Sequence, residues 1–207
     1  MRLWKVLGPD RQSLVSGAEY RYPAGRWTRH LDPASLALCE CGYHCAEGEQ
    51  VLDWLDEGLL CEVEVCPEHE PLRGDGKSVS CRLRIVRTFR LDARTLRLFA
   101  CDCAERALRR ERKQGREPAA ASWEAVRVAR LFANGLATRE ELDAAGAAAR
   151  AAWAAAGAAA RAAWAAARAA AWAAAAGAAA WAAAWDAAWD KDRRWQYRRL
   201  LKLAGAA

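Results

Sequence analysis

The stretch LCEVEV, Leu60–Val65, alternates apolar and acidic residues without a break. Successive side chains on a strand point to opposite faces, so this pattern predicts a half-buried β-strand. Ser78–Phe89 alternates in the same way, with arginines on one side, and Leu3–Leu7 is predicted to be a further short strand. Gln50–Leu55 has the spacing of a short helix. Together these segments predict a small β-rich domain.

The period of the apolar residues becomes helical after residue 90. Asp92 is a candidate N-cap for a helix that ends near Lys113. Ser122 is a candidate N-cap for a second helix, which Asn134–Gly135 should end. Thr138–Glu141 forms a capping box, in which the first and last residues satisfy each other's backbone, and it should open a third helical region.

From Ala147 to Trp185 the chain contains only Ala, Arg, Trp and Gly. Alanine is the best helix former, so the alanine/tryptophan tract 144–189 is predicted to be helical. It is expected to fold back into a bundle, with a self-associating rod held by alanine faces as the alternative. The fold class is therefore α+β: a small β-rich domain over 1–90, followed by an all-helical, Ala/Trp-rich bundle over 91–207.

The tryptophans and arginines of the tract form a pattern on a continuous helix. Residues eleven apart return to nearly the same face, and each arginine precedes a tryptophan by three or four residues, which allows cation–π contact. Both residue types are favoured at protein interfaces. The candidate partner-binding residues are Arg150, Trp153, Arg161, Trp164, Arg168, Trp172, Trp181, Trp185 and Trp189.

Three cysteines and a histidine lie within the seven residues Cys39–Cys45, and Cys61 and Cys66 are the next two cysteines. Zinc is held by four ligands of these types, so a zinc site is one interpretation. Small buried thiols in a β-rich domain are the other. The candidate metal ligands are Cys39, Cys41, His44, Cys45, Cys61 and Cys66, and no other cofactor is expected.

The formal net charge of +6 favours an acidic partner. Basic residues gather in the helix 94–116 and in the tail 191–202, where aromatic residues lie among them, a pattern that suits nucleic acids. A solvated helix face, with cations near helix C-termini, is the alternative. The candidate nucleic-acid contacts are Arg106, Arg109, Arg110, Arg112, Lys113, Arg194, Arg198 and Arg199.

The N-terminal segment Met1–Leu7 is interrupted by Gly8–Asp10 and does not have the length of a secretion signal. The eight cysteines are therefore expected to be reduced thiols or metal ligands, and the location to be cytoplasmic. The uncharged stretch Ala169–Trp185 is short for a membrane span and lacks large aliphatic residues, so no membrane association is expected.

Two blocks of the sequence carry a resemblance. Leu38–Cys45, with Val51–Leu55 and Glu62–Val65, resembles a small uncharacterised domain of bacterial and phage proteins. Arg97–Leu108, with Val128–Leu142 and the alanine-rich tract, is similar to an all-helical group of immunity-like proteins. The resemblance implies a protein that acts by binding another protein, such as a toxin or a phage or host factor, and it brings no catalytic residues.

Motifs for catalysis are weak in this sequence. It has no phosphate loop, no readable Ser–His–Asp set and no paired carboxylates in an apolar setting. The first hypothesis is therefore a non-catalytic, immunity-like interaction protein. A nucleic-acid-binding module is the second hypothesis, and a zinc-dependent or thiol enzyme is the third.

Overall fold

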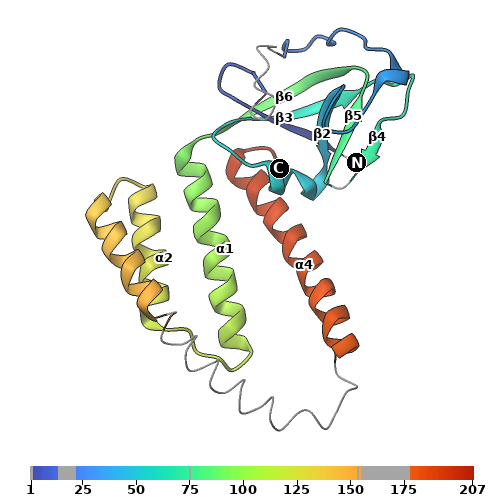
Figure 1. Ribbon diagram of the computed structural model, residues 1–207. Helices are drawn as coiled ribbons and strands as arrows, with labels where there is room; N and C mark the ends of the chain where they lie inside the picture. Colours follow the sequence, from blue (N-terminus) through green and yellow to red (C-terminus); the bar gives the residue numbers. More distant parts are fainter. Residues whose placement is uncertain (1, 14–21, 75, 153, 155–177) are drawn as a thin grey trace. The chain divides into compact units, whose positions relative to one another are not determined.

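The computed structural model describes residues 2–13, 22–74, 76–152, 154 and 178–207, and it describes the backbone alone over 178–190. An antiparallel sheet in the N-terminal part is followed by helices, so the predicted α+β class is confirmed (Figure 1). The chain forms two compact units. Unit 1 consists of Met1–Leu96 and Arg193–Ala207, and unit 2 consists of Arg97–Asp192. The stretch 193–207, which the sequence placed with the helices, thus belongs to the unit that contains the sheet.

The sheet of unit 1 has six strands in the order β4-β5-β2-β1-β3-β6, and each neighbouring pair is antiparallel. The strands are β1 (Leu3–Leu7), β2 (Tyr43–Glu47), β3 (Gly58–Val65), β4 (Leu72–Gly74), β5 (Lys77–Ser80) and β6 (Leu83–Leu91). The short 3-10 helices η1 (Pro33–Ser35) and η2 (Gly48–Trp54) lie beside β2 in the sequence.

Two predicted strands are present as expected, and the third is divided. β1 has the predicted bounds, and β3 extends the predicted Leu60–Val65 by two residues. The stretch predicted as one strand over Ser78–Phe89 forms β5 and β6, because Cys81 and Arg82 lie between the two strands. The alternation of residue types continues across Cys81 and Arg82, so the sequence pattern does not reveal the break between the strands. The helix predicted over Gln50–Leu55 is the second part of η2.

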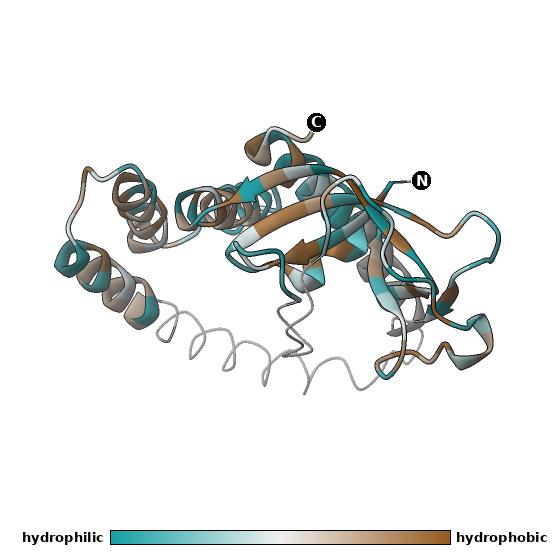
Figure 2. Ribbon diagram, turned by 90° about the horizontal axis from the view of Figure 1, so that it is seen from above, coloured by the Kyte–Doolittle hydropathy of each residue, from teal (hydrophilic) through white to brown (hydrophobic). Residues whose placement is uncertain are grey.

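Each face of the sheet has its own apolar packing. On one face lies a buried cluster of residues from the strands and from the segment between β1 and η1: Leu7, Tyr22, Tyr43, Cys45, Cys61, Val63, Leu83 and Ile85. On the other face, the fully buried Trp4 packs against Phe89 and against Tyr197 of α4 (Ala178–Ala204), with ring centroids 6.3 and 6.5 Å apart. The hydrophobic colour runs along the central strands in Figure 2. The last turns of α4 are therefore part of the core of unit 1.

Unit 2 contains α1 (Ala93–Lys113) from Arg97 onward, α2 (Ala120–Ala133), helical backbone over 139–152 and the first turns of α4. Arg130 of α2 joins the two helices, since its guanidinium bonds to Asp102 at 2.9 Å and to Glu105 at 2.7 Å on α1. Cys101 and Val128 are buried.

Three of the four predicted helix signals are confirmed. Asp92 caps α1 by accepting from the Thr95 N–H at 2.7 Å. The backbone N–H of Thr138 bonds to the Glu141 carboxylate at 2.7 Å, and the Glu141 N–H bonds to the Thr138 hydroxyl at 3.2 Å, which is the predicted capping box. Asn134 ends α2, as expected.

The predicted N-cap Ser122 is wrong. α2 begins at Ala120, and the backbone N–H of Ser122 already bonds to the carbonyl of Ala119 at 2.9 Å. Ala120 and Ala121 extend the helix toward the N-terminus, because alanine has the highest helix propensity. Ser122 therefore lies inside the first turn, where it cannot act as the cap.

Much of the alanine/tryptophan tract, residues 155–177, lies outside the described residues. The predicted bundle and its alternative, a rod, both depend on these residues. Both described ends of the tract, 144–152 and 178–189, are helical, as predicted. Of the helices in the described ranges, none combines the length and the hydropathy needed to cross a membrane.

Candidate functional site

β1 and β2 part from each other after two residue pairs. Leu3 and Trp4 pair with residues of β2, whereas Lys5, Val6 and Leu7 pair with β3 alone. A pocket of about 290 Å³ lies along this parting, entirely within unit 1. The aromatic and basic side chains that line it are Trp4, Lys5, Tyr22, His44, Trp54 and Lys77. Apolar walls with a few convergent polar groups are typical of small-molecule sites.

Lys5 places a positive charge inside this pocket. Its side chain is 9% exposed, and its Nζ donates a hydrogen bond to the carbonyl of His44 at 2.7 Å. Nζ also lies 4.8 Å from the centroid of the Tyr22 ring. Burial lowers the pKa of Lys5 to about 8, although the nearby Cys45 and Cys61 act in the opposite direction. The amine therefore remains mostly protonated at neutral pH.

The charge of Lys5 is not matched by a carboxylate among the described residues. The exposed Glu40 lines the pocket but forms no ion pair with Lys5 in the part of the chain that the structure describes. An ammonium has three donors, and His44 takes one of them. Because a buried cation without an anion is costly, the pocket favours an anionic occupant.

The rim of the pocket is organised by His44 and Lys77. The Nε2 atom of His44 accepts from the Cys39 N–H at 2.9 Å, so the neutral ring carries its proton on Nδ1. Burial, together with Lys5 and Lys77, lowers the pKa of His44, which keeps the ring neutral near pH 7. Lys77 Nζ lies 5.3 Å from the Trp54 ring centroid and donates to the Cys39 sulfur. The site thus combines two cations with flat aromatic surfaces.

The structure does not bring the predicted metal ligands together as a set. Cys45 and Cys61 belong to the buried cluster of the sheet, and burial raises the pKa of Cys45 to about 12. Cys39 is exposed, and Cys41 is half-buried and lies 3.7 Å from Ser35 Oγ. These six candidate ligands therefore do not form one group close enough for a single metal ion among the described residues, and zinc binding at them stays a prediction.

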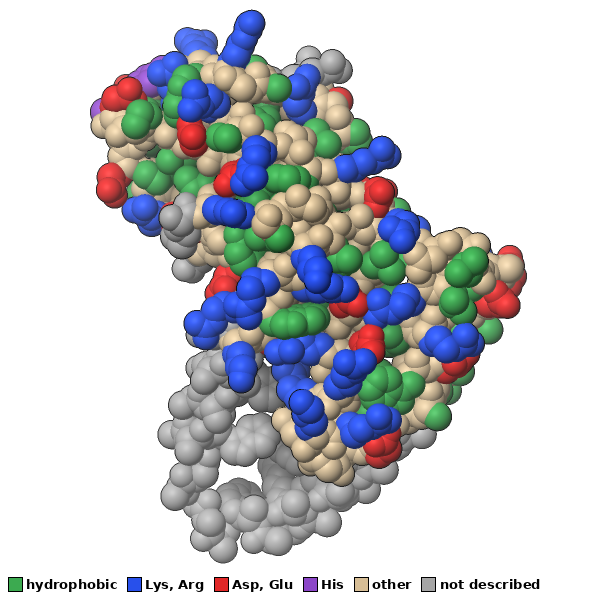
Figure 3. Space-filling view, turned by 180° about the vertical axis from the view of Figure 1, so that it is seen from behind, with side chains coloured by type: hydrophobic (Ala, Val, Ile, Leu, Met, Phe, Trp, Pro, Cys, Tyr) green, Lys and Arg blue, Asp and Glu red, His purple; other side chains and the backbone are tan. Residues whose placement is uncertain are grey.

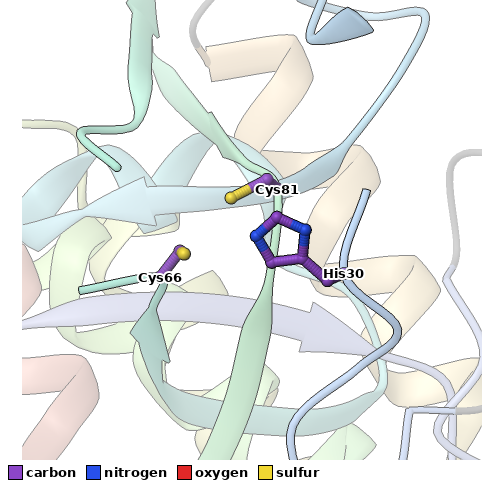
Figure 4. A group of neighbouring side chains, drawn as sticks. All are labelled: His30, Cys66 and Cys81. Carbon is purple, nitrogen blue, oxygen red and sulfur yellow. The ribbon is translucent and has the colours of Figure 1, made fainter. Parts of the chain in front are cut away.

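Cys66 belongs instead to another cluster. Within the described ranges, the group whose ligand atoms lie close enough for one metal ion consists of His30, Cys66 and Cys81, all within 4.8 Å of one another (Figure 4). Sequence reasoning missed His30 and Cys81. No local spacing marks them, because the three residues come from segments far apart in the chain.

The basic residues proposed to contact nucleic acid are divided between the two units, because Arg106–Lys113 belongs to unit 2 and Arg194–Arg199 belongs to unit 1. In unit 2, Arg106 and Arg110 both bond to Asp192, at 2.7 and 2.6 Å. Arg109 pairs with Glu105 at 2.5 Å, and Arg112 pairs with Glu117 at 2.6 Å.

These ion pairs bear on the nucleic-acid hypothesis. Figure 3 shows many Lys and Arg side chains on the visible face, with a smaller number of Asp and Glu side chains among them. Neighbouring carboxylates reduce the local potential that would attract phosphates. For Arg106, Arg109, Arg110 and Arg112, the pairing favours the alternative interpretation as members of solvated helix faces.

Only one residue of the proposed partner-binding stripe has a described side chain, Arg150, which is exposed. Trp153, Arg161, Trp164, Arg168 and Trp172 lie outside the described residues, and Trp181, Trp185 and Trp189 lie where only the backbone of α4 is described. The stripe thus stays a prediction.

Comparison of the chain with family models, with curated proteins and with solved structures finds no match. The proposals below therefore depend on the geometry of this chain alone.

Proposed function

We propose that this protein acts by binding, without a catalytic step of its own, a ligand that carries a carboxylate on a small apolar or aromatic body. The observation that supports this proposal is the ammonium of Lys5, buried at the parting of β1 and β2 with no carboxylate partner in the described part of the chain. A carboxylate in the pocket would accept charge-assisted hydrogen bonds from Nζ and would offset the cost of burying the cation.

The walls of the pocket support the second part of the proposal. Trp54 and Tyr22 present flat apolar surfaces beside the two lysines, and Lys77 offers a second cation near the rim. A volume of about 290 Å³ is at the lower end of the range for ligand sites. The expected ligand is therefore small, with one anionic end.

The carboxylate has two sources with the same chemistry, a free organic acid or an acidic group of a partner protein. An acidic group of a partner protein would agree with the immunity-like interaction protein proposed from the sequence. Two titrations distinguish these sources. Tight binding of benzoate indicates a free organic acid. Tighter binding of a short peptide that ends in phenylalanine, lost when its C-terminus is amidated, indicates a carboxylate of a partner protein.

The thiols support a binding role over the thiol-enzyme hypothesis. Burial raises the pKa of several of them, namely Cys45, Cys61, Cys66, Cys101 and Cys103. A thiol with a raised pKa carries little of the thiolate that acts as a nucleophile.

The test is calorimetric titration of the whole chain with benzoate and with benzamide, which has nearly the same shape and no charge. Benzoate should bind at least about tenfold more tightly, which corresponds to about 1.4 kcal/mol. Lys5→Met should abolish this preference, whereas the control Lys113→Met, at the end of α1, should keep it. Equal binding of the two compounds, or an unchanged preference in Lys5→Met, would show that the pocket does not recognise an anion.

A further inference from the structure

A second cluster of reactive side chains lies in unit 1 outside the pocket. It contains His30, from the segment before η1, Cys66, directly after β3, and Cys81, between β5 and β6. The imidazole and the two sulfurs face a common space in Figure 4. None of the three residues lines the Lys5 pocket.

From this geometry we infer that His30, Cys66 and Cys81 form a three-ligand binding site for Zn²⁺, with water in the fourth position and Glu68 beside Cys66. Two thiolates and an imidazole are ligands that zinc prefers, whereas Ca²⁺ and Mg²⁺ prefer oxygen. The carboxylate of Glu68 already lies 3.0 Å from the Cys66 sulfur, as acceptor of its S–H.

The spacing of the ligand atoms suits a tetrahedral ion. Zinc bonds of about 2.3 Å to sulfur and about 2.0 Å to nitrogen or oxygen place neighbouring ligand atoms about 3.5–3.8 Å apart. The three atoms of this cluster lie within 4.8 Å of one another. A contraction of about 1 Å at most is needed, which small side-chain rotations supply.

Backbone hydrogen bonds hold the three segments together without a metal. The N–H of Cys66 bonds to the carbonyl of Arg82 at 3.0 Å, next to Cys81. The N–H of Leu31, next to His30, bonds to the carbonyl of Cys81 itself at 3.0 Å. The ligands are thus placed by the sheet, so zinc binding does not require the chain to be reorganised.

The surroundings differ on the two sides of the cluster. Cys66 and Cys81 are 3% and 0% exposed, whereas His30 is exposed, which gives an ion a path from solvent. The His69 ring lies 6.1 Å from the His30 ring, so a second imidazole lies close by. On binding, Zn²⁺ replaces the protons of the two thiols, and these protons pass to solvent.

The experiment measures zinc binding by the reduced, full-length chain against a competing chelator, and Co²⁺ substitution reports thiolate ligation through its charge-transfer absorption. We expect one ion per chain. Loss of Cys66 or Cys81, in Cys66→Ser or Cys81→Ser, should remove the thiolate absorption. His30→Ala, a change at an exposed residue that leaves the core intact, should weaken zinc binding by about a hundredfold, and Glu68→Gln by about tenfold.

The matched control is the double variant Cys39→Ser/Cys41→Ser, which changes two cysteines outside the cluster. It should bind zinc as the parent chain does. Loss of zinc in this control would assign the ion to the Cys39–Cys45 segment and would overturn the proposal, as would undiminished binding in His30→Ala or the absence of zinc binding by the reduced chain. Failure of benzoate to bind has no bearing on these outcomes.

Discussion

The indole Nε1 of Trp4 donates a hydrogen bond of 2.8 Å to the hydroxyl of Tyr197, although 193 positions separate the two residues in the sequence. Close by, the guanidinium of Arg193 bonds to both carboxylate oxygens of Asp53 at 2.9 Å and to the carbonyl of Glu49 at 3.1 Å. The C-terminal turns of α4 are thus attached both to β1 and to η2, and they complete unit 1.

Removing the hydroxyl of Tyr197 should destabilise unit 1. In Tyr197→Phe the buried indole N–H of Trp4 loses its acceptor, and the free energy of unfolding should fall by about 1–3 kcal/mol. Denaturant unfolding measures this change. The double variant Trp4→Phe/Tyr197→Phe should be little less stable than Trp4→Phe alone, and additive losses would mean that the bond contributes nothing.

Replacing Lys5 should stabilise the protein at neutral pH. Burial lowers the pKa of Lys5 from 10.5 to about 8, so the folded state binds fewer protons than the unfolded state between these values. Stability therefore rises with pH across this window, and the cost of the buried charge is complete below pH 8. Lys5→Met should unfold with a free energy up to about 3 kcal/mol higher than the parent chain at pH 7.

The difference in the free energy of unfolding between Lys5→Met and the parent chain should change in one direction at high pH. The advantage of Lys5→Met should shrink as the pH rises from 8 to 10.5, because the parent chain loses the charge that opposes its folding. The lost hydrogen bond to His44 reduces the advantage at every pH. Urea unfolding at several pH values measures this change. A difference in unfolding free energy that stays constant with pH would contradict the lowered pKa of Lys5.

Benzoate affinity should follow the protonation of Lys5. Above pH 8 the free pocket loses its cation, so the apparent affinity should fall by up to about tenfold per pH unit. Titration calorimetry between pH 6 and pH 10 measures the profile. Lys113→Met should reproduce it, and an affinity that stays flat to pH 10 would place the carboxylate away from Lys5.

Gly58, at the start of β3, should not tolerate a side chain. Its φ is +152°, and a Cβ there would lie 2.1 Å from the backbone oxygen of Leu7, which cannot move aside without shifting β1. Gly58→Ala should cost about 3 kcal/mol or more. Gly48→Ala is the control, since φ there is +53° but a Cβ meets no atom within 4 Å, and it should cost about 1 kcal/mol.

Cys39 should be among the first thiols to react with iodoacetamide under native conditions. It is exposed, whereas Cys45, Cys61, Cys66 and Cys81 are buried. Short labelling followed by peptide mass spectrometry gives the order, and Cys39→Ser should remove the fast signal. Rapid labelling of Cys45 or Cys61 would contradict the described packing of the sheet.

The sequence was sufficient to predict those elements whose signal comes from residues close together in the chain. The alternation in β3 and the cap at Asp92 depend on neighbours a few residues away, and both are present as predicted. β2 and β4 were missed. The cysteines of Cys39–Cys45 suggested a metal site rather than a strand, and β4 has three residues, too few for a periodic pattern.

The candidate sites could not be predicted because long-range pairing creates them. Nothing in the sequence distinguishes Lys5 from other polar residues in a strand. Its position beside Tyr22 depends on the number of residue pairs that β1 and β2 form. His30 and Cys81 meet because Leu31 bonds to the backbone of Cys81. No residue spacing encodes a bond of this kind, so only the folded sheet reveals it.

The division of unit 1 into two segments has a consequence for how the protein is made. On the ribosome, the strands emerge first, but the helical turns that cover Trp4 emerge only after the whole of Arg97–Asp192 has been synthesised. Until then the apolar face around Trp4 has no Tyr197 to cover it. The nascent chain therefore exposes an apolar surface while residues 97–192 are synthesised, and surfaces of this kind make folding intermediates prone to aggregate.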